Sequence, residues 1–349
     1  MPPVATLPTD GPAPDTVVVT GADGWLGQNL VRALAPTRAR VRCLVHDAAL
    51  RPIVELAGPS VEVIEGDVRD PAALDRLFDG VGRASVFHAA GLIHPRRLRE
   101  LFDVNVGGTQ LVLDRARRAG TWRFVHVSSN SPFGANAHPG DRFDESSAPN
   151  PYMAYGRSKL EAEQLVAREH DRGDLATTIV RPPWFYGPFQ SERQTTWFRA
   201  VRTGRFPLVG DGTQRRSMVF TGNLVAGLLR AEVAAAAPGR AWWIADARPY
   251  ALSEVLATVR KALAAEGLAV TGTIRRIPRL AGVLAATADG VLQGRDRYAQ
   301  TVHVLGELKD TIACDIGAAQ RELGYEPATS LLDGMRASVR WCLERGHPL

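Results

Sequence analysis

The chain has 349 residues, enough to bury the core of one large domain or of two closely packed domains. Its 45% hydrophobic and 23% charged residues are ordinary for a globular protein, and the formal net charge of +5 comes almost wholly from arginine, because only three residues are lysine. This balance suits an anionic small molecule, but no basic run with interleaved aromatic residues predicts a nucleic-acid partner.

The N-terminal segment, residues 1–14, is rich in proline and has neither a basic start nor an apolar core, so we expect a disordered tail and no secretory signal. No apolar run reaches the roughly 18 residues that a membrane span needs. Three widely separated cysteines, Cys43, Cys314 and Cys342, match neither a disulfide framework nor a zinc site. We therefore expect a cytoplasmic protein with no metal and no membrane partner.

Short β-branched runs alternate with helical patterns from residue 15 to residue 182. This alternation predicts parallel strands with helices on both faces, the doubly wound Rossmann-type α/β fold, in which ligands bind beyond the carboxyl ends of the strands. The expected strands cover 16–20, 41–46, 61–66, 84–89, 124–129 and 177–182, and the clearest helical patterns of this part cover 96–119 and 151–171.

A glycine-rich turn follows the first expected strand, with Gly21, Gly24 and Gly27 ahead of the first helix. Glycine allows a tight turn and a close approach of the backbone to a pyrophosphate, whose charge the start of the helix stabilises. Because this turn opens a βαβ unit, it predicts a dinucleotide site, and Trp25 and Leu26 belong to the same turn.

The end of the second expected strand bears on the choice of dinucleotide. An acidic residue there would accept the ribose 2′-hydroxyl of NAD, and Asp47 is the candidate. Three basic residues, Arg42, His46 and Arg51, surround it and favour the 2′-phosphate of NADP slightly. We therefore expect NAD(P), with His46 among its contacts.

Asp67 and Val68 follow the third expected strand, in the sequence EGDVRD. An adenine would lie at this edge of the sheet, so both residues are expected to contact the cofactor. The alternative interpretation of Asp67 is a helix cap.

Tyr155 and Lys159 lie four residues apart at the start of a long expected helix, so their side chains face the same way. A phenol with a pKa near 10 is a poor base at neutral pH. An ammonium about 4 Å away contributes roughly 4 kcal/mol at an effective dielectric of about 20, so we expect Lys159 to lower the pKa of Tyr155 by about three units. Ser129, after the fifth expected strand, is placed to bond the substrate oxygen, although Ser128 and Ser131 are also candidates.

Seven motifs extend from Thr20 to Pro327, and together they resemble the extended short-chain dehydrogenase/reductase superfamily, which includes nucleotide-sugar epimerases, dehydratases and 3β-hydroxysteroid dehydrogenases. The resemblance implies a catalytic trio of Ser129, Tyr155 and Lys159, with Asn105 fixing the lysine through the backbone. The motifs are TGADGWLG at 20–27, HAAG at 88–91, NVGGT at 105–109, SSNSPFG at 128–134, YGRSK at 155–159, RPPWFYGP at 181–188 and ELGYEP at 322–327.

The same resemblance implies further cofactor contacts, from Ala89, Ala90 and Gly91 after the fourth strand and from Pro182 near the nicotinamide. It also implies a homodimer formed through the helices near 96–119 and 151–171.

The chain after the expected Rossmann domain (15–182) changes composition, and residues 183–349 are expected to form a smaller substrate-binding region. Its part over about 214–246 is expected to return to the Rossmann sheet. Helical patterns cover 221–236, 252–265 and 329–345, and a strand-like run covers 242–246.

The resemblance leaves the substrate open. In nucleotide-sugar enzymes of the superfamily an arginine at the position of Arg216 grips the substrate diphosphate, a task that suits a guanidinium. This favours an epimerase or ketoreductase of a nucleotide sugar, with Ser129 and Asn130 also in contact with the substrate. The sequence TGN at 221–223 instead resembles steroid-type dehydrogenases, so a reductase or dehydrogenase of a hydrophobic ketone or alcohol is an alternative. A cofactor-binding protein without turnover is a third.

Overall fold

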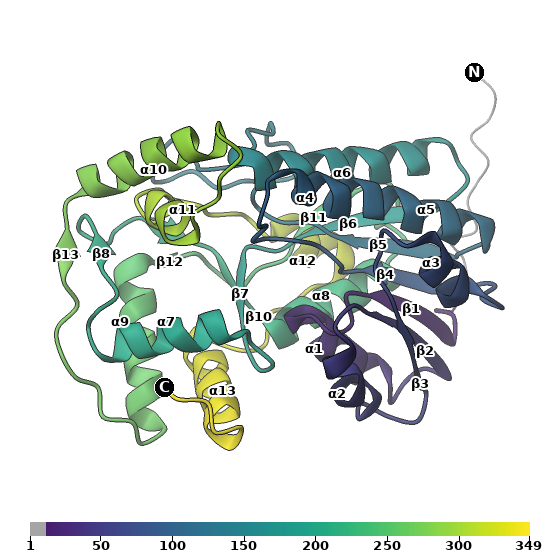
Figure 1. Cartoon of the computed structure of the whole chain (residues 1–349), viewed down its shortest axis with the longest axis horizontal. Helices are drawn as coiled ribbons and strands as arrows, with labels where there is room; N and C mark the ends of the chain where they lie inside the picture. The colour runs from purple at the N-terminus through teal and green to yellow at the C-terminus, as the bar shows by residue number, and fades with distance from the viewer. Residues whose placement is uncertain (1–11) are drawn as a thin grey trace.

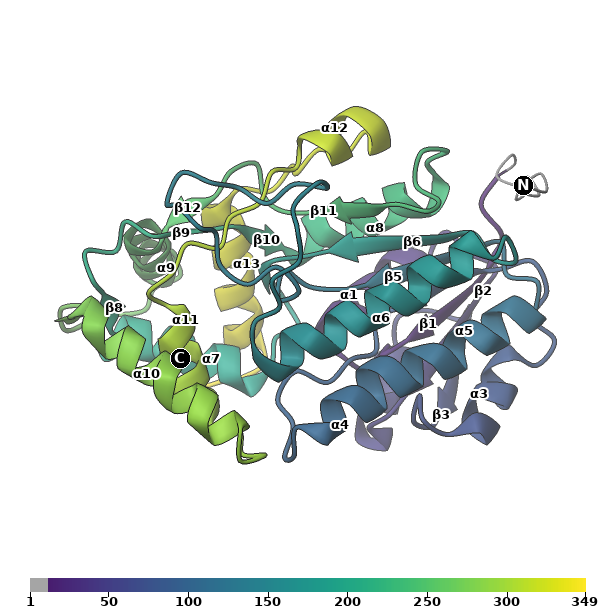
Figure 2. The same cartoon turned by 90° about the horizontal axis from the view of Figure 1, so that it is seen from above.

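The structure is a computed structural model that describes residues 12–349 (Figure 1). Most of the tail expected over 1–14 lies outside the described residues, and residues 12–14 have no regular secondary structure. The described chain forms a parallel sheet flanked by helices, with a second group of elements beyond the carboxyl ends of the strands (Figures 1 and 2).

The central sheet has seven strands in the order β11-β6-β5-β4-β1-β2-β3, and all neighbours are parallel. This arrangement confirms the predicted Rossmann-type fold. Six of the strands were predicted from the alternation of strand-like and helical sequence. The seventh, β11, comes from the later part of the chain and pairs with β6. The strands are β1 (Thr16–Thr20), β2 (Arg40–Val45), β3 (Val61–Glu65), β4 (Ser85–His88), β5 (Arg123–Val127), β6 (Thr177–Arg181) and β11 (Ala241–Trp243).

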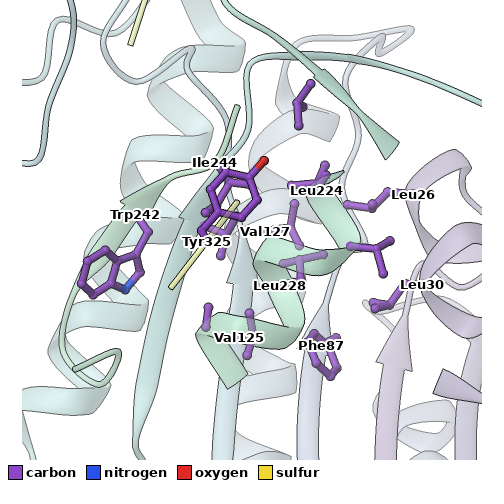
Figure 3. Packing of buried hydrophobic residues seen from close by; sticks show 14 of the residues in the cluster. Leu26, Leu30, Phe87, Val125, Val127, Leu224, Leu228, Trp242, Ile244 and Tyr325 are labelled. Atoms are coloured by element: carbon purple, nitrogen blue, oxygen red, sulfur yellow. The ribbon is translucent and has the colours of Figure 1, made fainter. Parts of the chain in front are cut away.

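Alternate side chains of β1 point to opposite faces of the sheet, so Val17 and Val19 pack on one face and Val18 on the other. The first face is covered by α1 (Trp25–Leu34), α8 (Thr221–Val233) and α12 (Gly317–Leu323), and Figure 3 shows Leu224 and Leu228 of α8 in this layer. The second is covered by α3 (Pro71–Phe78), α5 (Thr109–Arg118) and α6 (Met153–Asp171). The central strands β1, β4 and β5 are therefore buried on both faces, whereas the edge strand β3 combines apolar and exposed acidic residues.

Two short connections complete this part of the chain. The helix α2 (Arg51–Glu55) follows β2, and α4 (Arg99–Phe102) passes into a π-helical turn over Asp103–Gly108 before α5. Single π-helical turns occur frequently at functional sites.

The elements beyond the strand ends pack around a second core, formed largely by α7 (Glu192–Arg202), α9 (Leu252–Ala265) and α13 (Leu331–Glu344). Three two-stranded pairs brace it: β7 (Trp184–Tyr186) with β10 (Met218–Phe220), β8 (Leu208–Val209) with β13 (Arg276–Ile277), and β9 (Arg215–Arg216) with β12 (Tyr250–Ala251). The sequence predicted α8, α9 and α13 but not α7 or α12.

A helical hairpin lies at the outer edge of this region, where α10 (Arg279–Gln293) packs along α11 (Gln300–Glu307) (Figure 1). Neither helix was predicted from the sequence. Their contact is close, since a Cβ added to Gly306 would lie 3.0 Å from the Cα of Ala286.

Candidate active site

The glycine-rich turn connects β1 to α1, and two of its glycines are required by close backbone approaches. Gly21 has φ +70°, and an added Cβ would lie 2.7 Å from the Cα of Ala90. An added Cβ on Gly27 would overlap the carbonyl oxygen of Gly21. The turn is therefore held tightly against Ala89 and Ala90, which also bond Thr20 through their N–H groups, at 3.2 and 3.4 Å.

Trp25 and Leu26 begin α1 but point in different directions. Leu26 is buried in the core, whereas the Trp25 indole N–H donates to the carbonyl of Pro188 at 2.9 Å. The Trp25 ring packs on Phe185, with 4.8 Å between centroids. The side chain of Trp25 thus ties the turn to the segment after β7.

The ends of β2 and β3 lie side by side next to this turn. The Asp23 carboxylate accepts hydrogen bonds from the backbone N–H groups of His46 and Asp47, at 3.0 and 2.8 Å. The His46 ring is 73% exposed and lies 3.5 Å from Asp67. The turn, His46 and Asp67 therefore share one edge of the sheet, as predicted for a dinucleotide site.

Asp67 is not a helix cap, because the cap of α3 is Asp70, which accepts from the N–H of Ala72 at 2.9 Å. Asp67 instead pairs with Arg69 at 2.6 Å, and this hydrogen bond holds the pKa of Asp67 below its usual value. Val68, next to it, is buried against Gly108 of the π-helical turn.

Two of the three basic residues that favoured NADP interact with other parts of the protein. Arg42 is buried within β2 and donates to the backbone carbonyls of Arg76 and Asp79, at 2.6 and 2.5 Å. Arg51 pairs with two carboxylates, Glu55 at 2.7 Å and Glu65 at 3.0 Å. Their positions in the sequence suggested that both arginines could bind the 2′-phosphate of NADP. In the structure the pleat of β2 turns Arg42 toward backbone carbonyls, and Arg51 forms local ion pairs.

Tyr155 and Lys159 both begin α6, and the structure brings Lys159 to the carboxyl end of β5. The buried Lys159 ammonium donates to the carbonyl of Val127 at 2.7 Å. Gly91 lies beside it, since an added Cβ there would be 3.8 Å from the lysine Nζ and 3.4 Å from Asn105 Oδ1. The loop after β4, the π-helical turn and α6 thus meet at one point.

Asn105 joins these three segments through its side-chain amide. Oδ1 accepts from the N–H of Leu92 at 2.8 Å, while Nδ2 donates to the Leu92 carbonyl and to Ser158 Oγ, both at 3.0 Å. Its backbone carbonyl accepts from Thr109 Oγ1 at 2.6 Å. Over residues 12–349 Asn105 has no direct hydrogen bond to Lys159, so the role that the resemblance gives it stays a prediction.

Of the three candidate serines, Ser129 is the one whose side chain lowers the pKa of the Tyr155 phenol, and its role as the catalytic serine stays a prediction. Ser129 Oγ lies 3.1 Å from Ser131 Oγ, so Ser131 positions it. Ser128 Oγ is buried and has no hydrogen-bond partner within the described part of the chain. The next residue, Asn130, donates its N–H to the carbonyl of Pro182 at 3.2 Å, which places the serine loop beside the end of β6.

The predicted decrease in the pKa of Tyr155 is wrong for this structure. Burial raises the pKa of Tyr155 to about 12, and the opposing hydrogen bond from Ser129 does not compensate. Burial also lowers the pKa of Lys159 to about 8, against the nearby charge of Glu163. Attraction between phenolate and ammonium lowers the pKa of a tyrosine, but the cost of burying either charge opposes that attraction and is the larger effect here.

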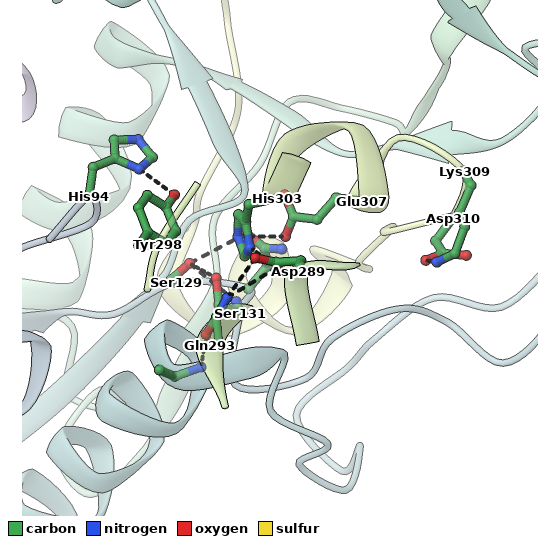
Figure 4. A network of polar contacts seen from close by, with 12 residues as sticks. His94, Ser129, Ser131, Asp289, Gln293, Tyr298, His303, Glu307, Lys309 and Asp310 are labelled. Atoms are coloured by element: carbon green, nitrogen blue, oxygen red, sulfur yellow. Dashed lines mark hydrogen bonds and ion pairs between the residues drawn. The ribbon is translucent and has the colours of Figure 1, made fainter. Parts of the chain in front are cut away.

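The hairpin of α10 and α11 covers this site with a polar cluster that the sequence analysis missed (Figure 4). His303 bonds Asp289 at 2.7 Å, and its ring packs between Tyr152 and Tyr298, 5.2 and 5.5 Å away. Tyr298 joins the small apolar cluster that includes Tyr155. A lone aspartate in the apolar sequence of α10 is the signal that could have identified this cluster.

The buried His303–Asp289 pair should make stability depend on pH. Burial disfavours the imidazolium, but the hydrogen bond that His303 donates to Asp289 and the charge of Glu307 outweigh it, so the pKa of His303 is raised. The pair therefore stabilises the fold fully below the unfolded pKa of about 6.5, and this contribution is lost as the pH rises through the folded pKa. We expect Asp289→Asn to lower the free energy of unfolding by about 3 kcal/mol at low pH and by less at high pH. Urea unfolding of both proteins across this pH range measures the difference, and a difference constant with pH would contradict the assignment.

Arg216 lies on β9 in the same cluster, but its side chain is not free to bind a ligand. It is buried, and its guanidinium donates to the backbone carbonyl of Glu307. Burial lowers the pKa of Arg216, and the carboxylates of Glu307 and Asp310 oppose that effect. Two acidic side chains beside Arg216 make this a poor place for a diphosphate, although its Nε has no hydrogen-bond partner in the described residues.

The sequence of this chain matches one protein family and is similar to several known proteins. The profile of the NAD dependent epimerase/dehydratase family matches residues 17–245. An uncharacterized protein, y4nL of Sinorhizobium fredii, is 40% identical over 95% of this chain and 96% of its own length.

Two relatives with described activities also match nearly the whole chain. A 4-hydroxy-2-methyl-3-oxo-4-farnesyl-3,4-dihydroquinoline-1-oxide ketoreductase of Stigmatella aurantiaca is 30% identical over 91% of this chain and 94% of its own. A 3 beta-hydroxysteroid dehydrogenase/Delta 5-->4-isomerase of Mycobacterium tuberculosis is 28% identical, over 89% and 86%.

Among solved structures, the dTDP-glucose 4,6-dehydratase of Streptomyces venezuelae with NAD bound superposes with a TM-score of 0.74. It is 26% identical, and the match covers 95% of this chain and 98% of that protein.

Proposed function

The chain belongs to the NAD dependent epimerase/dehydratase family, as the resemblance implied, and we propose that within it the protein is an NAD-dependent dehydrogenase or reductase of a hydrophobic alcohol or ketone. The observation that carries the proposal is the setting of Tyr155. The Tyr155 side chain packs against an apolar cluster of Leu98, Leu101 and Ala154, and Tyr298 packs against the same cluster. Such a wall suits a hydrocarbon next to the reacting carbon.

The chemistry follows from the groups around the reacting oxygen. Tyr155 gives a proton to the oxygen when a ketone is reduced and takes it back when the alcohol is oxidised. Ser129 donates a second hydrogen bond to the same oxygen. Lys159 places a positive charge at the end of β5, where the phenolate needs it. When bound, the nicotinamide supplies or accepts the hydride and, when oxidised, its positive charge favours the phenolate.

The substrate class is supported by the relatives as well as by the cluster. The farnesyl-dihydroquinoline ketoreductase and the 3 beta-hydroxysteroid dehydrogenase both have names that describe hydrophobic ketones or alcohols. The sequence analysis favoured a nucleotide sugar through Arg216, and the two carboxylates near Arg216 weaken that interpretation. A nucleotide sugar remains a second candidate, because the Nε of Arg216 lacks a partner in the described residues and a 26% identical dehydratase shares the fold.

The proposed cofactor is NAD rather than NADP. Arg42 is bonded to backbone carbonyls and Arg51 is paired with carboxylates, and His46 is the most exposed of the three basic residues near the predicted ribose site. A missing cationic partner for the 2′-phosphate costs about 1.5–3 kcal/mol, which is about tenfold or more in affinity. We therefore expect kcat/KM to be about tenfold higher with NADH than with NADPH.

Steady-state assays test the proposal directly. Steroid and long-chain ketones, and UDP- and dTDP-sugars, are offered with NADH and with NADPH, and the products are identified by mass spectrometry. We expect reduction of a hydrophobic ketone and no inhibition by UDP or dTDP. Conversion of a nucleotide sugar, with competitive inhibition by its nucleoside diphosphate, would establish the second candidate instead.

A further inference from the structure

The outward face of α10 is largely apolar. Four large aliphatic side chains project from it, and their exposed fractions are 63% for Leu280, 42% for Val283, 63% for Leu284 and 50% for Val291. Their spacing of three, four and seven residues puts them on one side of the helix. The polar residue on this side is Thr287, whose hydroxyl bonds the carbonyl of Val283 in the same helix.

The inward face of α10 has the opposite character. Gly282, Ala285 and Asp289 are its buried residues, and Asp289 is the partner of His303. Gly282 is packed so closely that an added Cβ would lie 2.9 Å from the Cβ of Lys309. A helix facing water normally turns its large apolar residues inward. In α10 they point outward, so this face has no partner within the described residues (Figure 2).

Arginines flank the apolar face at both ends of α10. All of them are exposed, and over residues 12–349 one has an acidic partner, Arg279 with Asp310 at 4.0 Å. The arginines are Arg275, Arg276 and Arg279 before the face and Arg295 and Arg297 after it. The exposed Asp296 lies between Arg295 and Arg297, so the surface is apolar in its middle and has a net positive charge at both ends.

We propose that α10 is a docking helix that inserts its outward face into the interfacial region of an anionic lipid membrane. Interfacial helices combine a continuous apolar face with arginines that bind acidic headgroups. The helix lies on the membrane and does not cross it, since none of the helices within residues 12–349 is long and apolar enough to span a bilayer. The absence of a long apolar run predicted no membrane partner, but an interfacial helix needs no spanning segment.

The charge pattern favours lipid over a second copy of the chain. If two copies packed α10 against α10, the arginines at the ends of one helix would face those of the other in either orientation, and like charges repel. The homodimer that the resemblance implies uses other helices, near 96–119 and 151–171. An anionic bilayer can bury the apolar face and bind the arginines through its acidic headgroups.

Docking would bring the covered side of the active site to the membrane. The side chain of Gln293, the last residue of α10, accepts from the N–H of Ala154 at 3.1 Å, one residue from Tyr155. Tyr298, just after the helix, packs in the Tyr155 cluster. Entry of a lipid-soluble substrate under this hairpin rests on the proposed function, whereas the docking itself does not.

Sedimentation of the full chain with vesicles tests the docking without any substrate. We expect binding to vesicles of phosphatidylcholine with phosphatidylglycerol, little binding to phosphatidylcholine alone, and release by high salt. The double variant Leu280→Glu/Leu284→Glu should lose at least tenfold in binding, because charge on the inserted face opposes insertion. Arg275→Gln and Arg276→Gln should each weaken binding about fivefold.

Leu56→Glu is the matched control, because Leu56 is 82% exposed on another surface, after α2. It should bind vesicles like the wild type, and circular dichroism confirms that each variant is folded. Failure of the wild type to bind anionic vesicles, or an equal loss in Leu56→Glu, overturns the proposal. A wild-type chain that ignores vesicles but whose oligomeric state changes with Leu280→Glu/Leu284→Glu would assign the face to self-association instead. Because no turnover is measured, these outcomes are independent of the substrate assays.

Discussion

Replacing Tyr155 by phenylalanine is expected to lower kcat by about 10²–10⁴-fold, the usual contribution of a positioned acid or base. Phenylalanine keeps the ring in the apolar cluster with Leu98 and Leu101 but removes the only atom of this side chain that can exchange a proton. The fold and the cofactor site should therefore remain intact. Rapid-quench turnover and fluorescence titration with NADH measure the two effects separately.

Tyr152→Phe is the matched control for this variant. Tyr152 precedes the same helix, and its hydroxyl is buried without a hydrogen-bond partner in the described residues. Losing that hydroxyl should change kcat by only a few fold. If Tyr152→Phe lost as much activity as Tyr155→Phe, the proton donor would have to be reassigned.

The relation of Tyr155 to Lys159 was predictable because it is local. Four residues along a helix bring two side chains to one face whatever the rest of the chain does. The pKa of Tyr155 was not predictable in the same way. It depends on burial by Ala154, by Leu101 of α4 and by Tyr298, which follows α10 and lies more than a hundred residues away in sequence.

The same distinction applies to the charged residues. Sequence spacing placed Arg42 near the end of β2, but the pleat of the strand decides which face a side chain occupies, and Arg42 faces the carbonyls at the end of α3. Arg216 was expected to bind a diphosphate, but its acidic neighbours Glu307 and Asp310 come from the end of the unpredicted helix α11 and the segment just after it. The hairpin was not predicted from the sequence, because the large apolar residues of α10 face outward, which reverses the pattern expected of a surface helix.

The glycine turn, in contrast, was predicted from the sequence, and close backbone contacts in the structure explain why it needs glycine. A substitution in this turn should therefore have a large effect. Gly27→Ala should lower the free energy of unfolding by about 3 kcal/mol and weaken NAD binding about 100-fold. The added methyl group overlaps the carbonyl oxygen of Gly21, so the turn must open. Opening it moves the N–H groups at the start of α1 away from the phosphates that they are expected to bind.

Gly82→Ala separates this effect from a general cost of replacing glycine. An added Cβ at Gly82 meets nothing within 4 Å, and its backbone is outside the left-handed region. Its free energy of unfolding should therefore stay within about 0.5 kcal/mol of the wild type, as for most surface substitutions. Urea unfolding and calorimetric titration with NAD compare the two variants. Unchanged NAD affinity in Gly27→Ala would mean that the phosphates bind elsewhere, because a turn that has opened cannot present the same row of N–H groups.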